Sequence, residues 1–152
     1  MLQEKSYKEI IQLKDSYAEV FCFSNNTEAK EYHITVHINN TRLNFRQQLE
    51  TLINSYNEIR IRLSDNAVAV FKRYFLSDAA NQENEVFDLE TSDCAISVIQ
   101  QPPIDGSKVA LWAYLIAGVK TCVLKNGLYM VKHNSYKHLW LGNYYVPEIN
   151  SE

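Results

Sequence analysis

The strictest pattern in this chain is the alternation of apolar and polar residues from Tyr32 to Ile38. Successive side chains of a strand point to opposite faces, so this period of two predicts a strand with one buried face. The apolar set is Tyr32, Ile34, Val36 and Ile38, and the polar set is His33, Thr35 and His37. Such a strand is expected in a sheet whose apolar face is covered by other elements.

The segment that follows changes to a helical period. Asn44 is a suitable N-cap, because its side chain can accept a hydrogen bond from a backbone N–H of the first turn. Apolar residues then recur at helical spacing at Phe45, Leu49, Leu52, Ile53, Tyr56 and Ile59. A second helix is predicted from a cap at Ser77 or Asp78 towards Leu89.

Further strands are predicted on both sides of these helices. They cover residues 20–23, 68–75, 94–99 and 109–116. The segment 109–116 is nearly all apolar, which predicts a central strand covered on both faces. Residues 102–106 predict a turn, since proline fixes φ and Gly106 tolerates a positive φ. Residues 2–15, with few apolar positions among charges, are expected to form a short helix or a lead-in segment.

This order of elements predicts an α+β fold, in which two helices pack on one face of a mixed β-sheet. We expect an N-terminal lead-in at 1–19, an α+β core at 20–118, and at 119–152 a β-rich tail or a link to a second domain. Asn126-Gly127 is a hairpin signal within that tail. The sheet face away from the helices is expected to be covered by the tail or by another subunit.

Composition and motifs exclude several classes of protein. The formal charge of −3 provides no electrostatic footprint for nucleic acid, and no apolar run approaches the ~20 residues of a membrane span. The spacing of the three cysteines, Cys22, Cys94 and Cys122, is not that of a zinc site. They are expected to be free thiols in a reducing cytosol. No nucleotide-binding or metalloprotease motif is present. We therefore expect a cytoplasmic protein with no metal, cofactor, membrane or nucleic-acid partner.

Three runs resemble the RidA (YjgF) family and its longer bacterial, chorismatase-like relatives. They are Glu31–Val36, Phe71–Gln82 and Gln100–Gly106. The resemblance covers residues 20–118 and implies the chorismate-mutase-like fold and self-association as a trimer or pseudo-trimer. It also implies that the chain is the first domain of a longer two-domain protein.

The catalytic pair of the RidA family is not matched. In that family an Arg before the Pro–Gly turn binds a substrate carboxylate, and a Glu after it positions water. Those positions fall here near Asp93 or Cys94 and near Trp112. Without the Arg there is no bidentate carboxylate clamp, and without the Glu no group orients water.

These departures predict a divergent RidA-like domain that is non-catalytic on its own and serves small-molecule binding or assembly within a larger protein. The alternative is a deaminase- or hydrolase-like enzyme that acts on a small enamine, imine or chorismate-like acid between subunits or domains. A third hypothesis is the endoribonuclease activity attached to some family members, which the acidic balance disfavours.

The candidate ligand-binding residues lie in the runs that carry the resemblance, and the catalytic residues are unknown. They are Arg73, Asp78, Asn81, Gln82, Gln100, Gln101 and Asp105. Arg73 lies at the end of an apolar strand and either binds an anion or pairs with a neighbouring carboxylate. Asp78 is alternatively a helix N-cap, and the residues around the two prolines are alternatively ordinary turn residues. The expected ligand is a small carboxylic acid or an enamine.

Histidines form two further groups. His33 and His37 lie about 13 Å apart along one strand, too far to bind one metal, so His33 is expected to be a half-buried imidazole. His133 and His138 lie in an aromatic tail with Tyr129, Tyr136, Trp140, Tyr144 and Tyr145. That tail either stacks a ligand or packs in a core or subunit interface.

Overall fold

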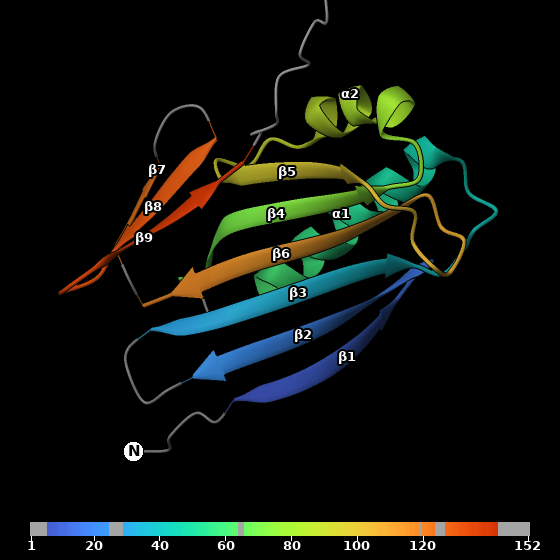
Figure 1. Cartoon of the computed structure of the whole chain (residues 1–152). Coiled ribbons are helices and arrows are strands. Elements are labelled where there is room, and N and C mark those ends of the chain that lie inside the picture. The colour runs from blue at the N-terminus through green and yellow to red at the C-terminus, as the bar shows by residue number, and fades with distance from the viewer. Residues whose placement is uncertain (1–5, 25–28, 64–65, 119, 124–126, 143–152) are drawn as a thin grey trace, which may run out of the picture.

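The computed structural model describes residues 6–24, 29–63, 66–118, 120–123 and 127–142, with the backbone alone for 120–123. Two helices cover one face of a six-stranded sheet, and a three-stranded sheet lies at one end of the molecule (Figure 1). The elements are β1 (Tyr7–Leu13), β2 (Ser16–Ser24), β3 (Lys30–Ile38), α1 (Phe45–Arg62), β4 (Val68–Leu76), α2 (Ala79–Leu89), β5 (Ala95–Gln100), β6 (Val109–Ala117), β7 (Lys120–Val123), β8 (Leu128–Lys132) and β9 (Lys137–Leu141).

The large sheet has the strand order β1-β2-β3-β6-β4-β5. Its neighbours are antiparallel except for β4 and β5, which α2 connects as parallel strands. The predicted α+β class, with a mixed sheet and two helices, is confirmed. Figure 1 shows α1 lying behind the sheet across β3, β6 and β4.

The alternation in β3 decides which face is buried. Its apolar side chains pack against Leu49, Leu52 and Ile59 of α1. β6 lies between β3 and β4 in the sheet. Most of its side chains are buried, whichever face of the sheet they point to, as its apolar sequence predicts. The helix-covered face therefore holds the main core, and the opposite face is called the open face below.

Both helices begin where their capping residues predict. Asn44 accepts a hydrogen bond from the backbone N–H of Gln47, whose side chain accepts one from the N–H of Asn44, at 2.9 and 3.0 Å. This reciprocal capping box satisfies two donors that the first turn leaves without partners. α2 begins after Asp78, within the predicted range.

The N-terminal segment is a strand, where a helix or lead-in is expected from the sequence. β1 pairs with β2 along its whole length, and Ile11 and Leu13 pack against the edge of the core. Asp15 turns the chain with a φ of 61°, a left-handed conformation that Asp tolerates better than most residues. The predicted boundary at residue 20 thus falls inside β2, which belongs to the same sheet as the core strands.

β7, β8 and β9 form the small antiparallel sheet at the end of the open face. Tyr129 and Val131 of β8 are buried against Val70, Phe71 and Ile116 of the large sheet. The tail therefore covers part of the open face, as expected. In the predicted Asn126-Gly127 turn, Gly127 has a φ of 73°. Asn126, Tyr144 and Tyr145 lie outside the described residues.

A close approach of two backbones joins the sheets. The N–H of Gly142 donates to the carbonyl of Gly127 at 2.7 Å. A Cβ added at Gly142 would lie 2.3 Å from both the nitrogen and the oxygen of Ile96 in β5. Only glycine leaves room for this contact, so the small sheet rests directly against the edge strand β5.

Candidate functional site

Aromatic and histidine rings form a continuous series of contacts over the open face, and we call this series the aromatic array. It comprises Phe23, His33, Phe71, Trp112, Tyr114, Tyr136, His133, His138 and Trp140. Its first five members come from β2, β3, β4 and β6, and its last four from β9 and the turn that precedes it. Trp140 joins the two parts through Tyr114, at 5.5 Å between ring centroids.

His33 lies at the centre of the array. Its Nδ1 accepts a hydrogen bond from Nε1 of Trp112 at 3.2 Å, which requires a neutral imidazole that carries its proton on Nε2. Phe23 and Tyr114 meet the His33 ring edge-on, at 5.6 and 4.3 Å. The prediction that His33 is a half-buried imidazole is confirmed.

Burial lowers the pKa of His33, and the nearby carboxylate of Glu31 opposes this effect. The unfolded chain therefore takes up its proton at higher pH than the folded chain does. The stabilisation contributed by neutral His33 is complete above pH 6.5 and is lost as the pH falls below that value towards the folded pKa.

We therefore expect His33→Gln, which keeps an acceptor for Trp112, to lessen the loss of stability on acidification. The free energy of unfolding of both chains would be measured by urea denaturation at pH 7.5 and 5.5. His37→Gln is the matched control, because His37 stacks on Tyr17 beside the array. An equal loss in the original and His33→Gln chains would contradict the assignment.

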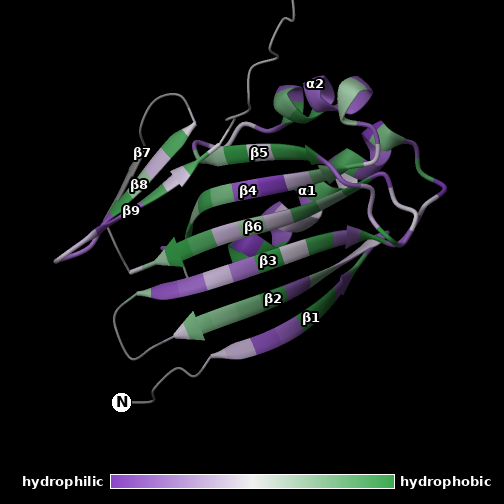
Figure 2. Cartoon of the chain, in the orientation of Figure 1, coloured by the Kyte–Doolittle hydropathy of each residue, from purple (hydrophilic) through white to green (hydrophobic). Residues whose placement is uncertain are grey.

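Arg73 lies beside the aromatic array in the middle of β4, where Figure 2 shows a hydrophilic stretch. The strand register places it between Ser97 of β5 and Trp112 of β6 on the open face. Its Nε donates to Oγ of Ser97 at 3.3 Å, and its Cζ lies 5.3 and 5.9 Å from the ring centroids of Phe71 and Trp112.

No carboxylate among the described residues lies within 4.0 Å of Arg73. The alternative that Arg73 pairs with a neighbouring carboxylate is therefore not seen within that part of the chain. Its terminal nitrogens donate to none of the described atoms. A half-buried guanidinium of this kind can bind an anion with two parallel hydrogen bonds.

Three other candidate residues build the turn between β4 and α2, and the structure does not bring them to Arg73. Gln82 is buried, donates to Oγ of Ser77, and accepts from the backbone N–H of Asp78. Asp78 holds the N-cap position, but its carboxylate accepts from the Asn81 amide instead of from a backbone N–H. Their contacts are those of a structural corner.

Gln100, Gln101 and Asp105 also lie at this end of the sheet. The Gln100 side chain accepts from the backbone N–H of Ala79 at 3.2 Å, and it thereby caps α2 from the neighbouring strand. The Gln101 N–H donates to the carbonyl of Leu76. Asp105 accepts from the N–H and hydroxyl of Ser107, a turn-forming contact. Gly106 has a φ of 83°, as the turn prediction requires.

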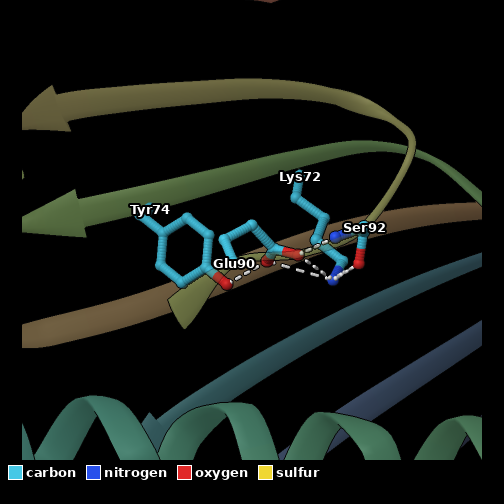
Figure 3. Close-up of polar contacts among 4 residues, drawn as sticks. All are labelled: Lys72, Tyr74, Glu90 and Ser92. Carbon is cyan, nitrogen blue, oxygen red and sulfur yellow. Dashed lines mark hydrogen bonds and ion pairs between the residues drawn. The ribbon is translucent and has the colours of Figure 1, made fainter. Parts of the chain in front are cut away.

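A buried ion pair that sequence analysis does not identify lies on the helix-covered face (Figure 3). The side chains of Lys72 and Glu90 are 3% and 4% exposed. Nζ of Lys72 donates to both Glu90 oxygens at 3.1 Å and to Oγ of Ser92 at 2.8 Å. Tyr74 donates its hydroxyl to Glu90 as well. The one sequence signal is the lysine itself, which takes an inward position of β4 next to the apolar run Val68–Phe71.

These contacts keep the buried carboxylate ionised. Burial alone would raise the pKa of Glu90, but the ammonium of Lys72 and the hydrogen bonds from Tyr74 and Ser92 lower it below its usual range. Nζ of Lys72 also lies 4.1 Å from the ring centroid of Tyr56. Because every ammonium hydrogen bond is internal, this cluster stabilises the fold and offers no open position to a substrate.

Cys94 has no property of a nucleophile. Burial raises the pKa of its thiol to about 12, so the reactive thiolate is scarce at neutral pH. No group of three or more His, Cys, Asp or Glu that could hold a metal ion occurs in the described part of the chain.

No family model, curated protein or solved structure matches this chain. Among the described residues, no helix is both long and apolar enough to cross a membrane.

Proposed function

We propose that this chain is a divergent RidA-like domain that binds a small carboxylic acid on the open face of its sheet and is non-catalytic on its own. The observation that carries the proposal is the guanidinium of Arg73, which lies between Ser97 and Trp112 without a carboxylate within 4.0 Å among the described residues. The RidA-like assignment rests on the three sequence runs and is supported by the α+β class of the fold.

The properties of two residues support the non-catalytic part of the proposal. Trp112, near the expected position of the family's Glu, donates to His33 and cannot orient water as a base. Cys94, near the expected position of the family's Arg, is a half-buried thiol whose pKa is raised by burial. Self-association as a trimer or pseudo-trimer, within a larger protein, is part of the same proposal, and the exposed Phe23 ring on the open face supports it.

Removing the guanidinium tests the proposed site. Arg73→Ala should weaken binding of cyclohexanecarboxylate, a non-aromatic probe, at least tenfold, because a charge-assisted hydrogen bond to carboxylate is lost. The affinity of Arg73→Lys should lie between those of the original chain and Arg73→Ala, since an ammonium keeps the charge but cannot form two parallel hydrogen bonds. Affinities would be measured by isothermal titration calorimetry.

Arg42→Ala is the matched control, because Arg42 is an exposed guanidinium in the loop before α1. Its affinity should equal that of the original chain. Equal affinity in Arg73→Ala would show that the acid binds elsewhere, and no binding by the original chain would also reject the site. Turnover of enamines generated from amino acids would favour the enzymatic alternative.

A further inference from the structure

The rings of His33 and Trp112 form one planar surface. Their planes differ by 9°, and their centroids lie 5.9 Å apart. The hydrogen bond between Nε1 and Nδ1 runs in the plane of both rings, since an indole N–H and an imidazole lone pair each lie in the ring plane. The two rings therefore lie side by side, and they extend one flat surface across β3 and β6.

Other rings bound this surface without continuing it. Phe23 and Tyr114 are inclined by 84° and 76° to the His33 ring, so they stand nearly upright beside it. Phe71 is inclined by 56° to the Trp112 ring. A flat surface between upright rings suits a planar ligand, whose ring can stack on the surface and meet its neighbours edge-on.

The guanidinium of Arg73 lies at the Trp112 end of this surface. Cζ of Arg73 is 5.9 Å from the Trp112 centroid, so a group attached to a ring above Trp112 is within reach of the guanidinium. The open face also carries the carboxylates Glu19 and Glu31. Lys8 on this face is paired with Glu19, whereas Arg73 has no carboxylate partner among the described residues. One guanidinium without such a partner suits a monoanion and disfavours a polyanion such as a nucleic acid.

We infer that the acid bound on the open face is a planar aromatic monocarboxylate, whose ring stacks on His33 and Trp112 while its carboxylate binds Arg73. This inference rests on the proposed function and narrows its ligand class. The non-covalent contacts involved are one bidentate ion pair and one stacking contact.

Benzoate and cyclohexanecarboxylate have equal charge and similar size, so comparing them separates the contribution of stacking from that of the ion pair with Arg73. With the full chain in calorimetry, benzoate should bind about three- to tenfold more tightly than cyclohexanecarboxylate, the gain expected of aromatic stacking. The ring protons of bound benzoate should shift upfield in proton NMR, because they lie over the faces of other rings. Benzamide, which is planar but uncharged, should bind more weakly than benzoate.

Trp112→Leu should abolish the preference for benzoate, so that the two acids then bind this variant with equal affinity. His33→Gln removes the other half of the flat surface, and it is the alternative variant if Trp112→Leu does not fold. It should reduce the preference for benzoate over cyclohexanecarboxylate. Equal affinity for the two acids, with both still dependent on Arg73, would overturn the aromatic inference and leave the proposed function standing. Failure of both acids to bind, or binding unaffected by Arg73→Ala, would overturn both.

Discussion

Lys72→Met should lower the free energy of unfolding by about 3–5 kcal/mol, because it leaves the Glu90 carboxylate buried without its cation. Methionine fills a similar volume, so the loss reports the charge and not a cavity. Urea denaturation at pH 7 would measure it. Tyr74 and Ser92 would still donate to Glu90, but neutral donors cannot replace the ammonium.

The double variant Lys72→Met/Glu90→Gln supplies the critical comparison. It removes both charges and keeps an acceptor for Tyr74, so it should regain at least half of the lost stability. Lys108→Met, at an exposed lysine, should change stability by less than about 0.5 kcal/mol. If the double variant is no more stable than Lys72→Met alone, the buried charge is not the cause of the loss.

Gly142→Ala should lower stability by about 3 kcal/mol, the upper end of the cost of overpacking. The added Cβ would lie 2.3 Å from two backbone atoms of Ile96, which cannot rotate away as a side chain can. The small sheet must therefore separate from β5. Hydrogen exchange should become faster at the amides of β8 and β9 than at those of β2 and β3.

Gly106→Ala controls for the loss of glycine itself. Gly106 has a φ of 83°, and an added Cβ there would meet no atom within 4 Å. It should cost about 1–2 kcal/mol through backbone strain alone, with no change of exchange in β8 and β9. Unchanged exchange in Gly142→Ala would show that the contact with Ile96 does not hold the small sheet in place.

Much of the fold follows from local patterns in the sequence. The alternation in β3 predicts its buried face, and Asn44 predicts the start of α1, because both signals depend only on neighbouring residues. β1 is the exception. It is an edge strand with exposed residues on both faces, including Ile10, so its sequence carries no period of two.

The site was only partly predictable, because its contacts come from strand register. Arg73 is singled out by its sequence context, and the same context groups it with Asp78 and Asn81, its neighbours along the chain. The sheet instead places Ser97 and Trp112 on either side of it. The pairing of Lys72 with Glu90 depends on how the chain returns after α2, which no local pattern encodes.

The position of β6 between β3 and β4 also governs how the chain reaches its native state. The strands β3 and β6 are neighbours in the sheet, yet both helices and two strands separate them along the chain. Until residue 117 has been synthesised, β3 and β4 lack the strand that joins them. Closing so long a loop carries a large entropic cost before its contacts form, so folding should be slow and should begin only after β6 emerges from the ribosome.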